Sequence, residues 1–280
     1  MSNHGLAMRS QARCLVALMG ALLSLFAPST WAADAVSESV ITAALKGRSI
    51  SALVSHWREH DAFARAVLLL PGSPGIMKIQ AADAFGMTGN FLIRSRHAWL
   101  DRETLVVSVD APSDEWSNFS GQFRATERYA QDIQGLIHTL RQQYGPLPLT
   151  LVGTSEGSVS AYYAAKAIGE PQTKVIFSAS LFQGIRNSHG LNTLNFDDFK
   201  FPTLWVHHAD DPCRVTPYSQ AQQHAGKTRS PLITVRSSSA GRGEACKAFT
   251  QHGFVGMEAE TVRAMKLWVV QGVVSDVQGP

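Results

Sequence analysis

The sequence predicts a three-layer α/β/α sandwich built on a mainly parallel β-sheet. Short, continuously apolar segments alternate with longer segments whose apolar residues follow the 3.6-residue period of a helix. Strands that are apolar on both faces are typical of parallel sheets covered by helices on both sides. With 280 residues, 45% of them hydrophobic, the chain is long enough for one large domain of this class.

The expected elements follow one another in chain order. The expected strands lie at residues 50–54, 66–70, 105–109, 147–152, 174–178 and 203–207. The expected helices lie at residues 125–144, 158–168 and 257–270. In the first helix, apolar residues recur at helical spacing from Tyr129 to Leu140, and Gly145-Pro146 ends it. Since ligands bind at the carboxyl ends of parallel strands, we expect the functional residues in the loops that follow them.

The first 32 residues are predicted to be a secretory signal peptide. Arg9 and Arg13 precede an apolar run at residues 15–27, and small residues at Thr30 and Ala32 suit cleavage near Ala32 or Ala33. The apolar run is too short for an ordinary membrane span. We therefore expect residues 33–280 to form a single domain that is exported to a periplasm or to the outside of the cell.

The charge pattern argues against nucleic acid as a partner. Removal of residues 1–32 takes away Arg9 and Arg13 only and leaves 23 basic and 22 acidic residues. No basic run with interleaved aromatic residues is present. We expect a small-molecule or acyl-ester partner, while the oligomeric state stays open.

The segment Gly153-Thr-Ser155-Glu-Gly157 is the most informative motif of the chain. The expected strand 147–152 leads into it and the expected helix 158–168 leaves it. A serine with glycine two positions before and after it, set between a strand and a helix, is typical of a nucleophile elbow. The same five residues also occur in ordinary turns. A serine nucleophile needs a base, and the base needs an acid to orient it. The downstream residues therefore decide between a nucleophile elbow and an ordinary turn.

An acid and a histidine follow the serine in the order that an elbow requires. Asp210 and Asp211 come after the strand 203–207, and His252 precedes the last helix. Asp211, directly before Pro212, is preferred as the acid, and Asp210 stays an alternative if the loop is one residue shorter. His224 also follows the acid but lies in a polar, helical stretch, so His252 is the preferred base.

These motifs together resemble the α/β-hydrolase family over the whole mature chain. The matches are the 153–157 motif, an acid loop resembling Gly-x-x-Asp-Pro, the His252-Gly-Phe segment, and the Pro-Gly-Ser-Pro-Gly segment at 71–75. The resemblance implies the α/β-hydrolase fold and a catalytic triad. In that triad Ser155 is the nucleophile, His252 the base and Asp211 the orienting acid.

The same resemblance implies an oxyanion hole made by two backbone N–H groups, those of Ser73 and Glu156. Relatives usually carry His-Gly-x-Pro-Gly where this chain has residues 71–75. Pro71 replaces the usual histidine, which removes a side-chain hydrogen bond but leaves both backbone donors. His208 stands where the acid loop usually has glycine, so we expect a different shape for that turn.

Two cysteines remain after residues 1–32 are removed, and an exported chain with two cysteines favours one disulfide. Cys213 and Cys246 would close a loop of roughly 33 residues. Cys213 lies two residues after Asp211, and Cys246 lies six residues before His252. The bridge would join the acid loop to the histidine loop. The alternative is two separate buried thiols.

No cofactor or metal is expected. His207, His208, Asp210 and Asp211 form a cluster of potential ligands. Because neighbouring residues on a strand point to opposite faces, these side chains do not converge easily on one ion.

The substrate region is expected to be open. Residues 181–201 are too few for the helical cap that many family members carry, and residues 77–99 offer an apolar rim with Phe85, Met87, Phe91 and Leu92. The sequence thus favours a secreted serine hydrolase that acts on carboxylic esters through an acyl-enzyme. The alternatives are a peptidase or amidase, since residues 71–75 resemble the proline-iminopeptidase branch, and a non-catalytic binding protein of the same fold.

Overall fold

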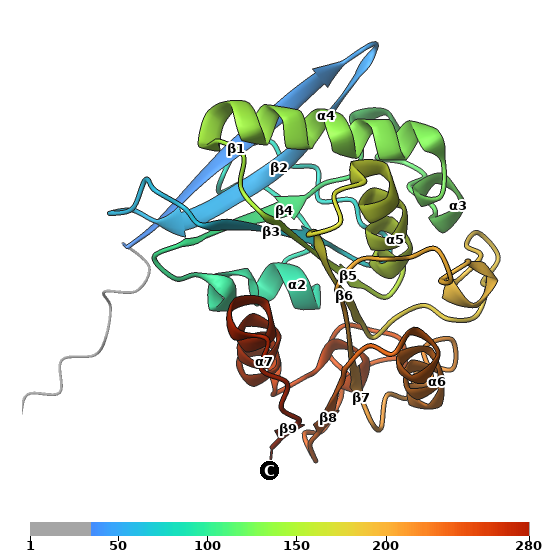
Figure 1. The fold of residues 1–280 in the computed structure, drawn as a ribbon. Helices are drawn as coiled ribbons and strands as arrows, with labels where there is room; N and C mark the ends of the chain where they lie inside the picture. The colour runs from blue at the N-terminus through green and yellow to red at the C-terminus, as the bar shows by residue number, and fades with distance from the viewer. Residues whose placement is uncertain (1–34, 280) are drawn as a thin grey trace, which may run out of the picture.

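The computed structural model describes residues 35–279, which build one nine-stranded sheet with helices on both faces (Figure 1). The predicted signal peptide at residues 1–32 lies outside the described residues. The strands are β1 (Val36–Leu45), β2 (Arg48–Trp57), β3 (Arg65–Leu70), β4 (Thr104–Val109), β5 (Leu149–Thr154), β6 (Lys174–Ser178), β7 (Thr203–His208), β8 (Leu232–Arg236) and β9 (Val277–Gln278).

The sheet has the strand order β1-β2-β4-β3-β5-β6-β7-β8-β9. The β1–β2 and β2–β4 pairs are antiparallel, and every pair from β4–β3 to β8–β9 is parallel. The predicted mainly parallel sheet is therefore confirmed. Its parallel arrangement brings the loops that follow β3, β5 and β7 to the same edge, because the carboxyl ends of parallel strands lie together.

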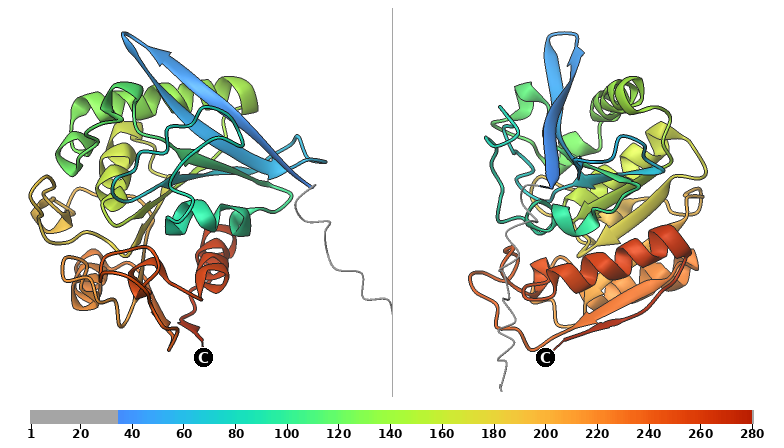
Figure 2. Two further views of the ribbon diagram at one scale, coloured as in Figure 1. Left: turned by 180° about the vertical axis from the view of Figure 1, so that it is seen from behind. Right: turned by 90° about the vertical axis from the view of Figure 1, so that its left-hand side faces the viewer.

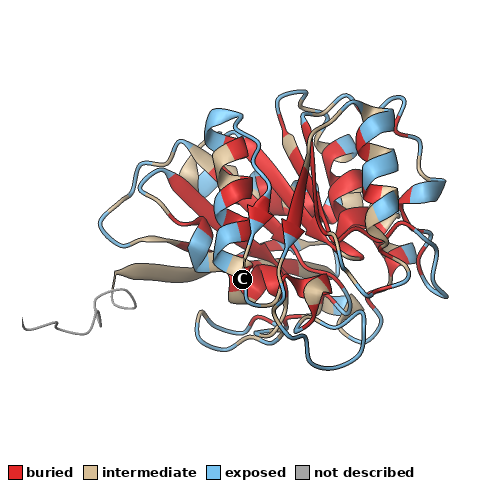
Figure 3. Cartoon of the chain, turned by 90° about the horizontal axis from the view of Figure 1, so that it is seen from below, coloured by how far each residue is buried: buried red, intermediate tan, exposed pale blue. Residues whose placement is uncertain are grey.

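The helices cover both faces of the sheet, and the alternation of side chains along the strands fills two separate cores. The helices are α2 (Phe91–Arg94), α3 (Gly121–Arg124), α4 (Glu127–Tyr144), α5 (Gly157–Ile168), α6 (Tyr218–Thr228) and α7 (Glu258–Gln271). In β3, Leu68 belongs to the core under α4, α5 and α6, whereas Val67 and Leu69 belong to the core under α2 and α7. Figure 3 shows the buried strands between helices whose outer sides are exposed.

The β1–β2 hairpin differs most from the sequence-based expectation. The expected strand at 50–54 is the middle of the longer β2, and β1 was not predicted at all. The two strands pair along their whole length around a turn that contains Gly47 (φ 75°), and the hairpin projects beyond the rest of the sheet (Figure 2). Most β1 residues are only partly buried, so the strand lacks the continuous apolar run that marks the central strands.

Glu38 connects this hairpin to the short 3₁₀ helix Arg96–Trp99 through hydrogen bonds and an ion pair. Its carboxylate accepts hydrogen bonds from Ser55 (2.7 Å), Arg96 (2.9 Å) and His97 (2.9 Å). Burial by itself raises the pKa of Glu38, but these hydrogen bonds and the charge of Arg96 outweigh it and lower the pKa from 4.5 to about 2. The ionised carboxylate thus stabilises the attachment of β1 and β2.

We expect Glu38→Gln to reduce the free energy of unfolding by on the order of 2 kcal/mol at pH 7. Because the folded-state pKa is lowered, this stabilisation is present above about pH 4.5 and is lost as the pH falls towards about 2. Urea unfolding of both proteins at pH 7 and pH 2.5 measures the difference, which should shrink at the lower pH. Glu103→Gln is the control, since its 2.8 Å ion pair with Arg65 is solvent-exposed and should contribute less than about 0.5 kcal/mol. An equal loss at both pH values would contradict the assignment.

No helix of the described part of the chain has the length and apolar character needed to cross a membrane.

Candidate active site

Ser155 stands at a sharp turn between β5 and α5. Its φ of 55° lies in the left-handed region, which is strained for a residue with a side chain. The two glycines of the motif are required by close packing. A Cβ on Gly157 would overlap the carbonyl oxygen of Leu70, and one on Gly153 would lie 2.8 Å from the Cα of Ser158. The strand and the helix therefore pack tightly around the turn that carries the half-buried Ser155, which is the geometry of a nucleophile elbow.

Asp211 follows β7 and turns its carboxylate inward. Its Oδ1 accepts a hydrogen bond from the N–H of Cys213 (2.9 Å), and its Oδ2 accepts one from Thr216 Oγ1 (2.8 Å). The side chain is fully buried. Asp210, the alternative acid, is exposed, and its own backbone N–H donates to His208 Nδ1 (3.1 Å). The structure thus brings Asp211, and not Asp210, to the interior of the loop.

His252 lies in a short 3₁₀ helix (Gln251–Gly253) after β8, where the hydroxyl of Thr250 caps its N–H. Its Nδ1 is 3.0 Å from Asp211 Oδ2 and 3.2 Å from Thr216 Oγ1. The carboxylate is an acceptor, so Nδ1 carries the proton and donates it to Asp211. Nε2 of the neutral ring is then left as a proton acceptor. The sequence does not single out Thr216, because a threonine five residues after an aspartate forms no distinctive pattern.

The other candidate histidines lie elsewhere. Burial lowers the pKa of His207 to about 3, and its Nε2 accepts a hydrogen bond from the N–H of Ser180 (3.0 Å). Burial and then the charge of Lys227 lower the pKa of His224 to about 4, and its Nε2 lies 2.9 Å from Asn192. Neither ring contacts Asp211.

The potential ligand cluster at the end of β7 is divided between separate environments. His207 points towards Ser180, whereas Nε2 of its neighbour His208 lies 3.1 Å from Ser237. Among residues 35–279, no three His, Cys, Asp or Glu side chains are grouped as a metal site would require.

Ser155 and His252 line one cavity of about 450 Å³. The segment at 71–75 forms part of its wall, and a Cβ on Gly72 would lie 2.9 Å from the Cβ of Ser155. The two predicted oxyanion donors, Ser73 and Glu156, line the same cavity. Within the described residues, neither of their backbone N–H groups has a hydrogen-bond acceptor. Both N–H groups are thus available to a ligand beside Ser155.

The entrance is formed by fewer of the expected rim residues than predicted. Phe91 lines the cavity, but Leu92 is fully buried under the sheet and Phe85 and Met87 pack against a third core cluster. The prediction that these three form the rim is therefore wrong. Asn90 of the same segment also lines the cavity, and the rest of its lining comes from other loops, including Leu181, Ile185, Val215, Lys247 and Ala248.

The predicted disulfide between Cys213 and Cys246 is present in the structure. Both cysteines line the cavity; Cys213 is buried and Cys246 is exposed. The bridge joins the loop that carries Asp211 to the segment that leads into His252.

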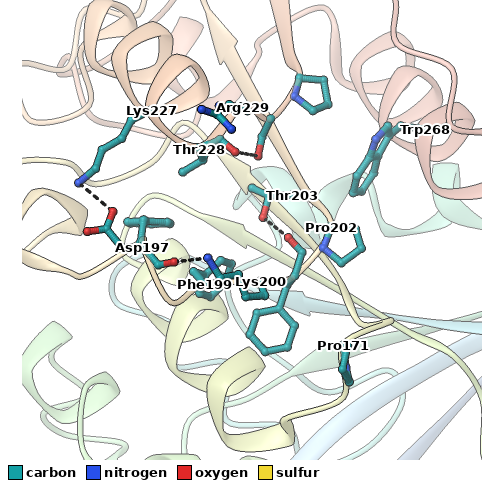
Figure 4. Close-up of a pocket in the computed structure, with 14 residues that line it drawn as sticks. Pro171, Asp197, Phe199, Lys200, Pro202, Thr203, Lys227, Thr228, Arg229 and Trp268 are labelled. Atoms are coloured by element: carbon teal, nitrogen blue, oxygen red, sulfur yellow. Dashed lines mark hydrogen bonds and ion pairs between the residues drawn. The ribbon is translucent and has the colours of Figure 1, made fainter.

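A larger cavity of about 780 Å³ lies at the opposite edge of the sheet (Figure 4). Pro171, Pro202 and Pro231, which precede β6, β7 and β8, line it, and Lys227 and Asp197 form an ion pair of 3.9 Å there. None of the candidate catalytic residues borders this cavity, so its size does not make it the active site.

Several solved structures resemble this fold over most of its length. A cold-adapted esterase from an Arctic intertidal metagenomic library is 14% identical, with a TM-score of 0.57, over 83% of this chain and 94% of that one. Est1E from Butyrivibrio proteoclasticus is 12% identical, with a TM-score of 0.58, over 84% and 98% of the two chains. XC6422 from Xanthomonas campestris, an α/β serine hydrolase without a lid, is 16% identical, with a TM-score of 0.53, over 81% and 94%.

No protein-family model matches the sequence, and no curated protein matches it either. At sequence identities of 12–16%, the similarity to these solved structures shows the fold alone. The chain has the α/β-hydrolase fold, as its sequence motifs predicted.

Proposed function

We propose that this protein is a serine hydrolase that cleaves carboxylic esters. The observation that carries the proposal is the 3.0 Å contact between His252 Nδ1 and the buried Asp211 Oδ2, because His252 lines the same cavity as Ser155 on its strained elbow. This arrangement orients the imidazole and leaves its Nε2 to accept a proton from Ser155.

The reaction would proceed through an acyl-enzyme. Ser155 Oγ attacks the ester carbonyl carbon while His252 takes the hydroxyl proton, and the carbonyl oxygen becomes an oxyanion. The backbone N–H groups of Ser73 and Glu156 would stabilise that charge, the second from the N-terminus of α5. His252 then donates its proton to the departing alcohol. His252 then deprotonates a water molecule, which attacks the acyl carbon. The bond between that carbon and Ser155 Oγ breaks as the acid leaves, and His252 returns the proton to Oγ.

The proposed substrate is a small acyl ester. The similar structures include named esterases, and one structure of Est1E has ferulic acid bound. The cavity is partly apolar, and the segment between β6 and β7 adds only a short 3₁₀ helix (Leu191–Thr193) above the sheet. An ester with one apolar group suits such a site.

We further propose that the protein acts outside the cytoplasm. The predicted signal peptide at residues 1–32 supports this location, and so does the disulfide between Cys213 and Cys246, because disulfides persist mainly in oxidising compartments.

A fluorophosphonate probe tests whether Ser155 is the nucleophile, and substrate assays alongside it test which bond the protein cleaves. Purified protein should be labelled in a manner that Ser155→Ala prevents, and it should hydrolyse p-nitrophenyl esters of short acids. Aminoacyl amides assayed alongside distinguish the peptidase alternative. Turnover of amides without esters would replace the proposed substrate, and the absence of Ser155-dependent labelling would favour a binding protein of the same fold.

A further inference from the structure

Arg124, the last residue of α3, is a fully buried arginine beside the segment that carries Ser73. Its Nη1 donates hydrogen bonds to the carbonyl oxygen of Pro71 (3.1 Å) and to Ser160 Oγ (2.9 Å). Its Nη2 donates to the carbonyl oxygen of Pro74 (3.4 Å). In the described part of the chain, no carboxylate lies within 4.0 Å of its guanidinium.

The segment at 71–75 wraps around this guanidinium. Pro71 and Pro74, whose carbonyl groups it binds, lie on either side of Ser73. Gly75 adopts a φ of 71°, and a Cβ at that position would overlap Nη2 of Arg124. The guanidinium therefore fixes the position of the backbone on both sides of the Ser73 N–H.

The third hydrogen bond reaches a different element. Ser160 lies in α5, one helical turn after Glu156, whose N–H is the second proposed oxyanion donor. The guanidinium thus connects the loop that supplies one donor with the helix that supplies the other. The distance between two backbone donors depends on the relative position of the loop and the helix, and Arg124 holds both.

A buried cation without a carboxylate partner is unfavourable for stability, and burial lowers the pKa of Arg124. The ring of Phe119 covers the guanidinium at 4.1 Å and compensates in part. The more distant carboxylate of Glu156 adds an attraction without a direct contact. An apolar side chain could fill this volume without the free-energy cost of burying a charge. The arginine therefore differs from an apolar core residue in the hydrogen bonds that it makes to the 71–75 segment and to Ser160.

We propose that Arg124 is a positioning residue that sets the spacing of the two oxyanion donors, Ser73 and Glu156. The inference rests on the proposed serine-hydrolase function. Such a residue acts on the transition state, because the oxyanion exists only there and on the way to the acyl-enzyme. Its replacement should therefore lower kcat and leave KM nearly unchanged.

Arg124→Lys tests this proposal, since lysine keeps the charge but has one ammonium group that cannot bridge both carbonyl groups and Ser160 with the same planar fork. Loss of a single oxyanion donor lowers kcat by roughly 10²–10³-fold, so displacement of the donors should lower it by about 10–100-fold. We expect KM within threefold of wild type. The affinity for a trifluoromethyl ketone, which forms a tetrahedral adduct on Ser155, should fall in parallel with kcat.

Rates are expressed per active site, titrated with the fluorophosphonate probe, so that a merely unstable variant does not appear slow. Arg128→Lys is the matched control, because Arg128 lies on the adjoining α4, stacks on Phe123 at 4.9 Å and makes no bond to the 71–75 segment. It should retain wild-type kcat. Unchanged kcat per site in Arg124→Lys, or an equal loss in Arg128→Lys, would overturn the inference.

Should Arg124→Lys fail to fold, Ser160→Ala is the second test, because it removes the hydrogen bond between Arg124 and α5 while Arg124 keeps its hydrogen bonds to Pro71 and Pro74. A kcat per site at least threefold lower supports the proposal, and an unchanged kcat refutes it. The controls also separate the two levels of the argument. If wild-type protein shows no Ser155-dependent turnover, the proposed function fails and the inference falls with it, whereas active wild-type protein with unaffected variants overturns the inference alone.

Discussion

Asp211→Asn is expected to lower kcat for a p-nitrophenyl ester by roughly 10⁴-fold while the protein stays folded. The amide of asparagine can donate a hydrogen bond to His252 Nδ1, which would move the ring proton to Nε2. That nitrogen could then no longer accept the proton of Ser155. The loss would come from the wrong tautomer and not from a lost contact, so KM should change little.

The surroundings of Asp211 predict that the variant keeps its geometry. Oδ1 accepts from the N–H of Cys213, and the side-chain carbonyl of asparagine can accept the same bond. The amide group would then face His252 and Thr216, whose hydroxyl can accept from it. Circular dichroism and the unfolding midpoint check that the fold is retained.

Asp210→Asn supplies the matched control. It makes the same chemical change one residue earlier, on an exposed side chain that does not contact His252. Its kcat should stay within about twofold of wild type, since surface substitutions away from such contacts have small effects. A large loss in Asp210→Asn with little loss in Asp211→Asn would reverse the assignment of the acid.

The parts of the site that the sequence predicted are those with a local cause. The elbow is specified by five consecutive residues. Gly153 and Gly157 are required there because a Cβ at either position would overlap neighbouring backbone atoms. The central strands could be predicted because burial on both faces leaves a continuous apolar run. Once the sheet is parallel, the loops after its strands share one edge, which brings Asp211 to the side of the sheet on which Ser155 lies.

The parts that the sequence did not predict depend on contacts between distant segments. In the sequence, Arg124 is a charged residue just before a helix, which gives no reason to expect burial. Its burial results from the packing of α3 against α5 and the 71–75 segment. Phe85 and Leu92 are apolar residues in the expected rim, but nothing local determines that one packs beside Arg96 and the other under the sheet. The strand β1 is half exposed at the edge of the sheet, so its pattern is weak.

The double replacement of Cys213 and Cys246 by serine is expected to lower the free energy of unfolding by about 3–4 kcal/mol. The bridge spans 33 residues, and the chain entropy that such a loop removes from the unfolded state corresponds to this value. Guanidinium chloride unfolding of the oxidised protein and the variant measures it. Reduction of the wild-type protein with dithiothreitol should reproduce the change.

The disulfide should also affect turnover, because it joins the loop of Asp211 to the segment that leads into His252, the proposed base. Cys213 donates its backbone N–H to Asp211, and the chain runs from Cys246 through the segment capped by Thr250 to His252. Without the bridge these loops are held together by the contacts of His252 Nδ1 with Asp211 and Thr216, so the imidazole should be misaligned for a larger fraction of the time. We expect kcat per titrated active site to fall by about 3–30-fold at 25 °C. An unchanged kcat would show that the packing of the loops suffices to align Asp211 with His252, and that the bridge contributes to stability alone.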